Sequence, residues 1–264
     1  MSAAETMPVI FIGHGNPMNV LQDNVFTRDW ERIGRELPRP KAILSISAHW
    51  ITPGRTLVHV GEKPKTIYDF GRFPDEMYNQ EYSAPGSPSI ARETIASVES
   101  VAIGEDTEWG FDHGTWTVLK RMFPDADIPT YQLSIDYAKP PLYHYEIAKE
   151  LRRLRSNGVL ILGSGNVTHN LGSVFGSGSG SGTDWAQEFD SRVKSDLDDS
   201  NDRDLIEFLE WGSLSRQAHP SHDHFLPMIY CIGLRDKVDT LSYFAEGFDM
   251  GTLSMRSFVL GSNR

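Results

Sequence analysis

Short apolar runs that end in small residues constrain this chain most strongly, because several of them lead directly to a histidine. The run over 42–46 (A-I-L-S-I) is followed by Ser47, Ala48 and then His49. A short apolar run that follows prolines is typical of a buried strand. In an open α/β sheet, ligands bind just beyond the carboxyl ends of the strands. Taken alone, however, His49 is better explained as a hydrogen-bonded structural histidine than as a ligand.

The same pattern recurs along the chain. Strands are expected over 8–12 and 159–162, and each runs into a glycine-containing turn that carries a histidine, His14 or His169. Helical spacing of apolar residues alternates with these strand patterns, which indicates an α/β fold with a largely parallel sheet. In a parallel sheet, residues that follow strands gather at one edge. His14, His49 and His169 are therefore predicted to converge.

Other segments complete this outline. Residues 66–82 are rich in aromatic residues and are expected to form a long ordered loop, a feature that is uncommon and often functional. Gly176–Gly182 alternates glycine and serine, the composition of a flexible linker, and its regularity makes an engineered loop replacement an equal alternative. Helices are expected over 205–211 and 225–234, and closing strands within 240–260.

Composition excludes several classes of function. The net charge of −11 argues against nucleic-acid binding and against attraction to anionic membranes. Cys231 is the only cysteine, so we expect neither an intrachain disulfide nor a thiolate metal cluster. No apolar stretch approaches the roughly 20 residues that span a bilayer, and no signal peptide is visible. A cytoplasmic protein is therefore expected, with no prediction of its oligomeric state.

The histidines fall into two groups. His59 and His144 lie within ordinary strand and helix patterns and are expected to be structural or surface residues. The others of interest sit just after a strand or at a turn before a helix: His14, His49, His113, His169 and His224. Several imidazoles without cysteine suit zinc or iron, so a metal site is favoured over a purely polar pocket.

Two local ambiguities accompany this prediction. Among His219, His222 and His224, one ligand is expected, and His224 is favoured because it immediately precedes the apolar helix. Ser164 lies in G-S-G, which lacks the G-x-S-x-G elbow of a serine nucleophile and the third glycine of a dinucleotide-binding turn. A serine hydrolase is therefore a weaker interpretation than a metal site.

Taken together, the motifs resemble the class III extradiol ring-cleavage dioxygenases, most closely the DOPA 4,5-dioxygenase subfamily of bacteria and plants. They occur in order over nearly the whole chain: G-H-G-N-P-M (13–18), S-A-H-W (47–50), G-F-D-H-G (110–114), S-G-N-V-T-H-N-L (164–171), H-F-L-P (224–227) and G-T-L-S-M (251–255). The resemblance implies one α/β domain over 1–264, with a central, largely parallel or mixed sheet and helices on both faces.

The resemblance also implies a chemistry. His14, His49 and His224 would hold a mononuclear metal, Fe(II) for activity or Zn(II), with His169 beside it as acid/base or fourth ligand. The substrates would be a DOPA-like catechol and dioxygen. His169 would then take a catechol proton, as a neutral histidine with a pKa near the working pH can, and His113 would stabilise charge on oxygen. A zinc hydrolase and a non-enzymatic metal-binding module stay open as alternatives.

Overall fold

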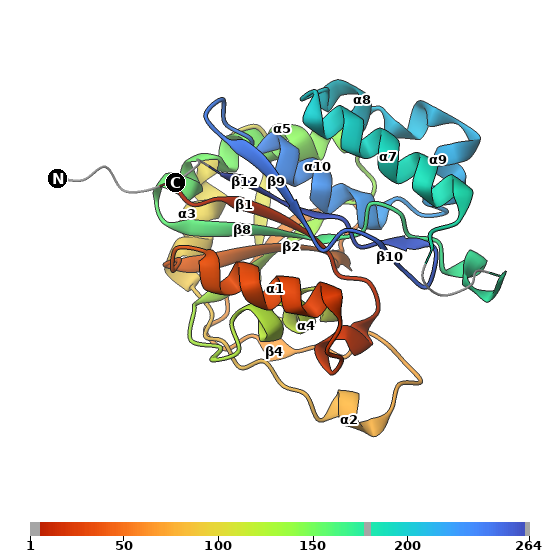
Figure 1. The fold of residues 1–264 in the computed structure, drawn as a ribbon. Helices are drawn as coiled ribbons and strands as arrows, with labels where there is room; N and C mark the ends of the chain where they lie inside the picture. The colour runs from red at the N-terminus through yellow and green to blue at the C-terminus, as the bar shows by residue number, and fades with distance from the viewer. Residues whose placement is uncertain (1–5, 177–180, 262–264) are drawn as a thin grey trace.

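The fold is built on one mixed sheet of eight strands in the order β5-β3-β7-β2-β8-β1-β12-β9 (Figure 1). The computed structural model of the protein describes residues 6–176 and 181–261. The sheet strands are β1 (Val9–Gly13), β2 (Ala42–Ile51), β3 (Thr56–His59), β5 (Ile103–Asp106), β7 (Thr130–Ile135), β8 (Val159–Gly165), β9 (Thr240–Phe244) and β12 (Ser257–Gly261). Strands β7, β2, β8 and β1 pair in parallel, whereas β12 and β9 pair antiparallel at one edge. The predicted α/β class with a mixed sheet is confirmed.

Alternating side chains of the central strands enter two separate cores. Val9 and Phe11 of β1 face one core, while Ile10 and Ile12 face the other. The helices α1 (Val25–Glu36) and α4 (His113–Met122) cover the second face. The first face is covered by α3 (Pro88–Ser97), α5 (Pro141–Leu151), α6 (Arg153–Ser156), α7 (Asp184–Asp198), α8 (Asp202–Ile206), α9 (Ser213–Ala218) and α10 (Leu226–Gly233) (Figure 1). Because helices cover both faces of the sheet, the ends of its strands are the part that the helices leave accessible.

Several short elements lie outside the main sheet. They are β4 (Lys65–Thr66), α2 (Asp75–Tyr78), β6 (Gly110–Phe111), β10 (Phe248–Asp249), β11 (Leu253–Ser254) and the 3-10 turns Pro17–Val20, Leu171–Gly176, Phe208–Trp211 and Asp223–Phe225. The loop predicted over 66–82 is present, with α2 as a single helical turn inside it. The continuous helix predicted over 205–211 is wrong, since α8 ends at Ile206 and a separate 3-10 turn follows.

Two further predictions concern segments rather than elements. Most of Gly176–Gly182, interpreted as a linker or a replaced loop, lies outside the described residues. Within 6–176 and 181–261, no helix has both the length and the apolar run that crossing a bilayer requires.

Strand β2 is longer than predicted, and this length positions His49. The sequence placed the end of the strand at its small residues, but β2 continues to Ile51. Its pairing with β8 stops at Ser47, and its pairing with β7 shifts register between Ile46 and Ile51. His49 therefore lies on the part of β2 that extends past its neighbour β8, at the carboxyl edge of the sheet.

Candidate metal centre

All five histidines singled out in the sequence line one cavity of about 370 Å³. His14 directly follows β1, and His169 follows β8. His113 is the first residue of α4, and His224 lies in the 3-10 turn before α10. The predicted convergence of His14, His49 and His169 is therefore what the fold produces, because β1, β2 and β8 run in parallel and end at the same edge.

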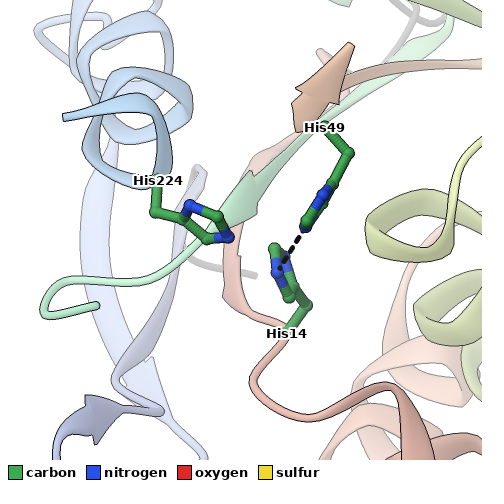
Figure 2. Close-up of side chains that lie close together, drawn as sticks. All are labelled: His14, His49 and His224. Carbon is green, nitrogen blue, oxygen red and sulfur yellow. Dashed lines mark hydrogen bonds between the residues drawn. The ribbon is translucent and has the colours of Figure 1, made fainter. Parts of the chain in front are cut away.

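Three of these imidazoles meet closely. Ligand atoms of His14, His49 and His224 all lie within 4.8 Å of one another, and the group could hold a metal ion. The Nε2 atoms of His14 and His49 are 3.2 Å apart (Figure 2). Figure 2 also shows His224 directing its ring toward this pair from the opposite side. Each of these histidines comes from a different segment, so the fold as a whole sets their spacing.

An acceptor oxygen lies close to the Nδ1 atom of each of the three rings. Ser164 Oγ donates to Gly114 O at 2.5 Å, so the hydroxyl accepts at 3.0 Å from His14 Nδ1. His224 Nδ1 donates to Asp223 Oδ1 at 3.1 Å. The third ring, that of His49, has its Nδ1 atom 3.2 Å from Asp69 Oδ2. Such partners fix the tautomer and orientation of metal-binding histidines.

This arrangement fits a cation at the common point. With protons on Nδ1, the three Nε2 atoms carry lone pairs, and those of His14 and His49 face each other at 3.2 Å. Two opposed lone pairs repel unless a proton or metal ion lies between them. His224 Nε2 is buried and has no hydrogen-bond partner among the described residues. A buried polar atom without a partner is costly, and a metal bond would satisfy it.

The charge state of the rings also suits a metal. Burial, followed by the neighbouring imidazoles, holds the pKa of His14 and of His49 well below its usual range. Burial alone would raise the pKa of Asp223, but the hydrogen bond and charge of His224 hold it well below its usual range. The His14 and His49 rings are therefore neutral at neutral pH, which is the form that a metal ion requires of its histidine ligands.

His113 lies beside this group, held by Asp69. The His113 backbone N–H donates to Asp69 Oδ1 at 2.8 Å, and its Nδ1 lies 2.9 Å from Oδ2 in a second hydrogen bond. The ring centroids of His113 and His49 are 3.8 Å apart. Gly114 permits this approach, because a Cβ there would lie 2.6 Å from Ser47 Oγ and 3.1 Å from His49 Cδ2.

His169 stacks on His224, with centroids 3.5 Å apart and planes within 3°. Burial, then the charges of neighbouring imidazoles, lowers the pKa of His169 to about 2, while Asp223 offsets only part of this effect. The sequence-based expectation of a pKa near the working pH is therefore not met in the free site. The ring is neutral at neutral pH and becomes a better base only when negative charge enters the cavity.

The remaining histidines lie elsewhere. His222 stacks on Tyr137 at 4.3 Å, and its Nδ1 lies 3.1 Å from the Tyr137 hydroxyl, outside the histidine group. His219 Nε2 donates to Val167 O at 2.8 Å, within a cluster of phenylalanine rings. His144 is buried against Tyr230 at 3.0 Å, as expected of a structural residue.

Sequence reasoning missed the residues that hold the rings. The sequence analysis does not single out Asp69 or Asp223, and it considers Ser164 only as a weak candidate nucleophile. Ser164 is fully buried, with its hydroxyl between Gly114 O and the His14 ring. For Asp223, adjacency to a candidate ligand was a usable signal. Asp69 gave no such signal, because it lies 44 residues from His113 and the fold alone brings them together.

Apolar side chains form the walls of the cavity above the histidines. These are Pro17, Phe70, Phe73, Leu171, Met250 and Leu253. Phe70 and Phe73 belong to the aromatic loop, and their rings pack edge to face with centroids 5.0 Å apart. A concave site of this size with apolar walls and a few convergent polar groups is typical of a small-molecule pocket.

Comparisons with known proteins agree with this arrangement. Residues 8–252 match the family described as the catalytic LigB subunit of aromatic ring-opening dioxygenase. The 4,5-DOPA dioxygenase extradiol of Escherichia coli (strain K12) is 45% identical over 261 residues, 97% of this chain and 95% of that protein. The protein of the same name from Beta vulgaris is 34% identical, covering 96% of each chain.

A solved structure extends the agreement to the fold. The crystal structure of an uncharacterized protein from Escherichia coli K12 superposes with a TM-score of 0.84 at 41% identity, covering 97% of this chain and 100% of that one. The predicted family and enzyme class are confirmed, and the family's chemistry is metal-dependent extradiol ring cleavage. This chain therefore belongs to the LigB family of class III extradiol dioxygenases, oxidoreductases that open aromatic rings with dioxygen.

Proposed function

We propose that this enzyme opens the ring of a DOPA-like catechol at a mononuclear Fe(II) ion held by His14, His49 and His224. The observation that carries the proposal is the convergence of ligand atoms of His14, His49 and His224, with Nδ1 of His14 and of His224 hydrogen-bonded and Nδ1 of His49 3.2 Å from Asp69 Oδ2. Three protein ligands leave coordination positions open for exogenous ligands. When bound, the ion would supply the redox-active centre at which catechol and dioxygen meet.

The choice of substrate rests on the cavity and on the relatives. The two relatives described above are named 4,5-DOPA dioxygenases. The walls contributed by Phe70 and Phe73 offer aromatic surface to a single ring, and the five histidines that line the same cavity offer polar groups to the two catechol oxygens. Aromatic side chains pack well against a substrate ring through offset or edge-to-face contacts.

We assign proton transfer to the two cavity histidines that are not proposed metal ligands. His169 is neutral in the free site, so it can accept a proton once an anionic catechol raises its pKa. His113 is held at Nδ1 by Asp69, and the carboxylate would stabilise positive charge on this ring when negative charge develops on a substrate oxygen. Both rings line the same cavity, within reach of one bound molecule.

Zinc is the second metal in this proposal. Zinc binds sites of nitrogen ligands more tightly than iron(II) does, so zinc can occupy the same three histidines in a resting form. His169 stacks on His224 and could serve as a fourth ligand in that form. The proposal keeps iron(II) for activity because ring opening with dioxygen needs a redox-active metal. A cytoplasmic site of action stays a prediction.

Metal analysis coupled to a catechol assay tests the proposal. Protein reconstituted with Fe(II) should convert L-DOPA to a yellow ring-opened product in air and should do nothing without oxygen. His49→Ala should lose bound metal, and His169→Gln should keep most of the metal while losing most of the turnover. Turnover that persists under anaerobic conditions would instead indicate hydrolysis. Full metal occupancy in His49→Ala would refute the ligand assignment.

A further inference from the structure

We propose that Asp69 is a positioning residue shared by His49 and His113, so that one carboxylate sets the orientation of a metal ligand and of a substrate-facing histidine. This inference rests on the proposed function for the roles of the two histidines. Asp69 lies in the aromatic loop, and its side chain is 17% exposed. The neighbouring residue Phe70 lines the cavity.

The carboxylate makes three contacts at once. Its Oδ1 accepts from the His113 backbone N–H at 2.8 Å. Its Oδ2 accepts from His113 Nδ1 at 2.9 Å and lies 3.2 Å from His49 Nδ1. An ionised carboxylate has about four lone-pair sites and no donor, so it can serve all three groups without conflict. Both rings then carry their proton at Nδ1 and keep Nε2 free.

The nearby Asp112 does not duplicate this role. Its carboxylate accepts from Ser47 Oγ at 2.6 Å, from Gln132 Nε2 at 2.8 Å and from the Thr115 N–H at 3.1 Å. These partners place Asp112 at the start of α4, where it caps the helix that begins with His113. Asp112 therefore fixes the helix end, while the ring directions of His113 and His49 depend on Asp69.

Asp223 provides a natural comparison, because it holds one imidazole only. Its Oδ1 accepts from His224 Nδ1 at 3.1 Å and from the His224 N–H at 2.9 Å. Loss of Asp223 should therefore weaken metal binding and leave the His113 ring in place. Loss of Asp69 should weaken metal binding and also misdirect His113, a defect that added metal cannot repair.

The experiment compares Asp69→Asn with Asp223→Asn and with Asp75→Asn, an exposed residue of the same loop. Asparagine cannot replace Asp69 fully, because its NH₂ group would oppose either the His113 backbone N–H or its Nδ1–H. Zinc affinity is measured by competition with a chromophoric chelator. Values of kcat, KM and the pH profile for L-DOPA are then measured at saturating Fe(II).

We expect Asp69→Asn and Asp223→Asn each to bind zinc roughly ten- to a hundredfold more weakly, the usual effect of losing such a partner. At saturating iron, Asp69→Asn should stay at least about tenfold slower than the wild type and show an altered pH profile, since an oriented acid/base group contributes about a hundredfold or more. Asp75→Asn should match the wild type in both assays.

Three results would overturn the inference. The first is wild-type zinc affinity in folded Asp69→Asn, and the second is full recovery of its kcat to the wild-type value at saturating iron. If Asp69→Asn does not fold, Asp69→Ser, which places no amide donor against the His113 N–H, is measured with the same criteria. The third result is wild-type zinc affinity and wild-type kcat in Asp69→Ser. A wild-type protein that binds zinc but opens no catechol would contradict the proposed function, while the zinc measurements would still decide whether Asp69 holds His49.

Discussion

Replacing Gly165 with alanine should separate the stability of the fold from the integrity of the metal centre. Gly165 is the last residue of β8 and is buried. A Cβ atom at this position would lie 2.1 Å from His224 O and 3.2 Å from Pro227 Cγ. The nearest obstacle is backbone rather than the end of a flexible side chain, so no rotamer change can relieve the contact.

The structure gives the size of the displacement. Ordinary van der Waals contact with a Cβ begins at 3.4 Å, so the His224 carbonyl would have to retreat from 2.1 Å by about 1.3 Å. Bonds between a metal and its ligands tolerate only about 0.2 Å. Overpacking a core costs about 1–3 kcal/mol in the free energy of unfolding. A moderate loss of stability should therefore accompany a much larger loss of metal affinity, at least about a hundredfold.

Two assays test this expectation, one on the metal-free protein and one on the protein titrated with zinc. Urea unfolding measures the stability change, and chelator competition measures zinc affinity. Gly233→Ala is the matched control, because its Cβ would lie 2.7 Å from Tyr145 O at the far end of α10, away from the histidines. The control should lose stability with unchanged zinc affinity. Equal zinc affinity in Gly165→Ala and the wild type would refute the role given to the His224 backbone.

Three further predictions concern buried groups. Asp239→Asn should destabilise the fold by about 3–5 kcal/mol in urea, because the fully buried Arg155 loses its carboxylate partner, while zinc affinity should not change. Burial lowers the pKa of His144 to about 4, so only the unfolded chain takes up this proton as the pH falls from 6.5 toward 4. The free energy of unfolding should therefore drop by up to about 3 kcal/mol over that range. His144→Gln should lack this contribution, and a pH dependence of stability that is the same in His144→Gln and the wild type would contradict it. His222→Phe should retain zinc, whereas His224→Phe should lose it, and the reverse order in metal analysis would overturn the choice of ligand.

The strand ends and their histidines could be predicted from sequence because both depend on local patterns. The apolar run before His49 is typical of a buried strand, and the turns that carry His14 and His169 each follow a buried strand. These three strands end at the same edge of the sheet. The extension of β2 to Ile51 could not be predicted, because the register shift against β7 depends on where the neighbouring strands end. The prediction therefore placed His49 at the carboxyl edge of the sheet and misplaced the end of its strand.

The choice between His222 and His224 shows a different limit. Both precede the same apolar helix, and both flank the same aspartate. The 3-10 turn Asp223–Phe225 directs His224 into the cavity, whereas His222 is captured by the hydroxyl and ring of Tyr137. That partner lies 85 residues away in the sequence. Adjacency to the helix favoured His224, but only a distant side chain explains where His222 goes.

The hydrogen-bond acceptors at the Nδ1 atoms explain why the sequence could identify candidate metal ligands but could not rank how strongly each would bind a metal. His14 is held by a neutral hydroxyl, whereas His49 and His224 each face a carboxylate. A carboxylate partner raises the basicity of an imidazole more than a hydroxyl does, so the three proposed ligands are chemically unequal. The carboxylates of Asp69 and Asp223 also bring two formal negative charges next to the imidazoles, and these charges would balance a divalent ion in a buried site. These acceptors come from the aromatic loop, the turn before α10 and the end of β8, and only the folded chain brings them together.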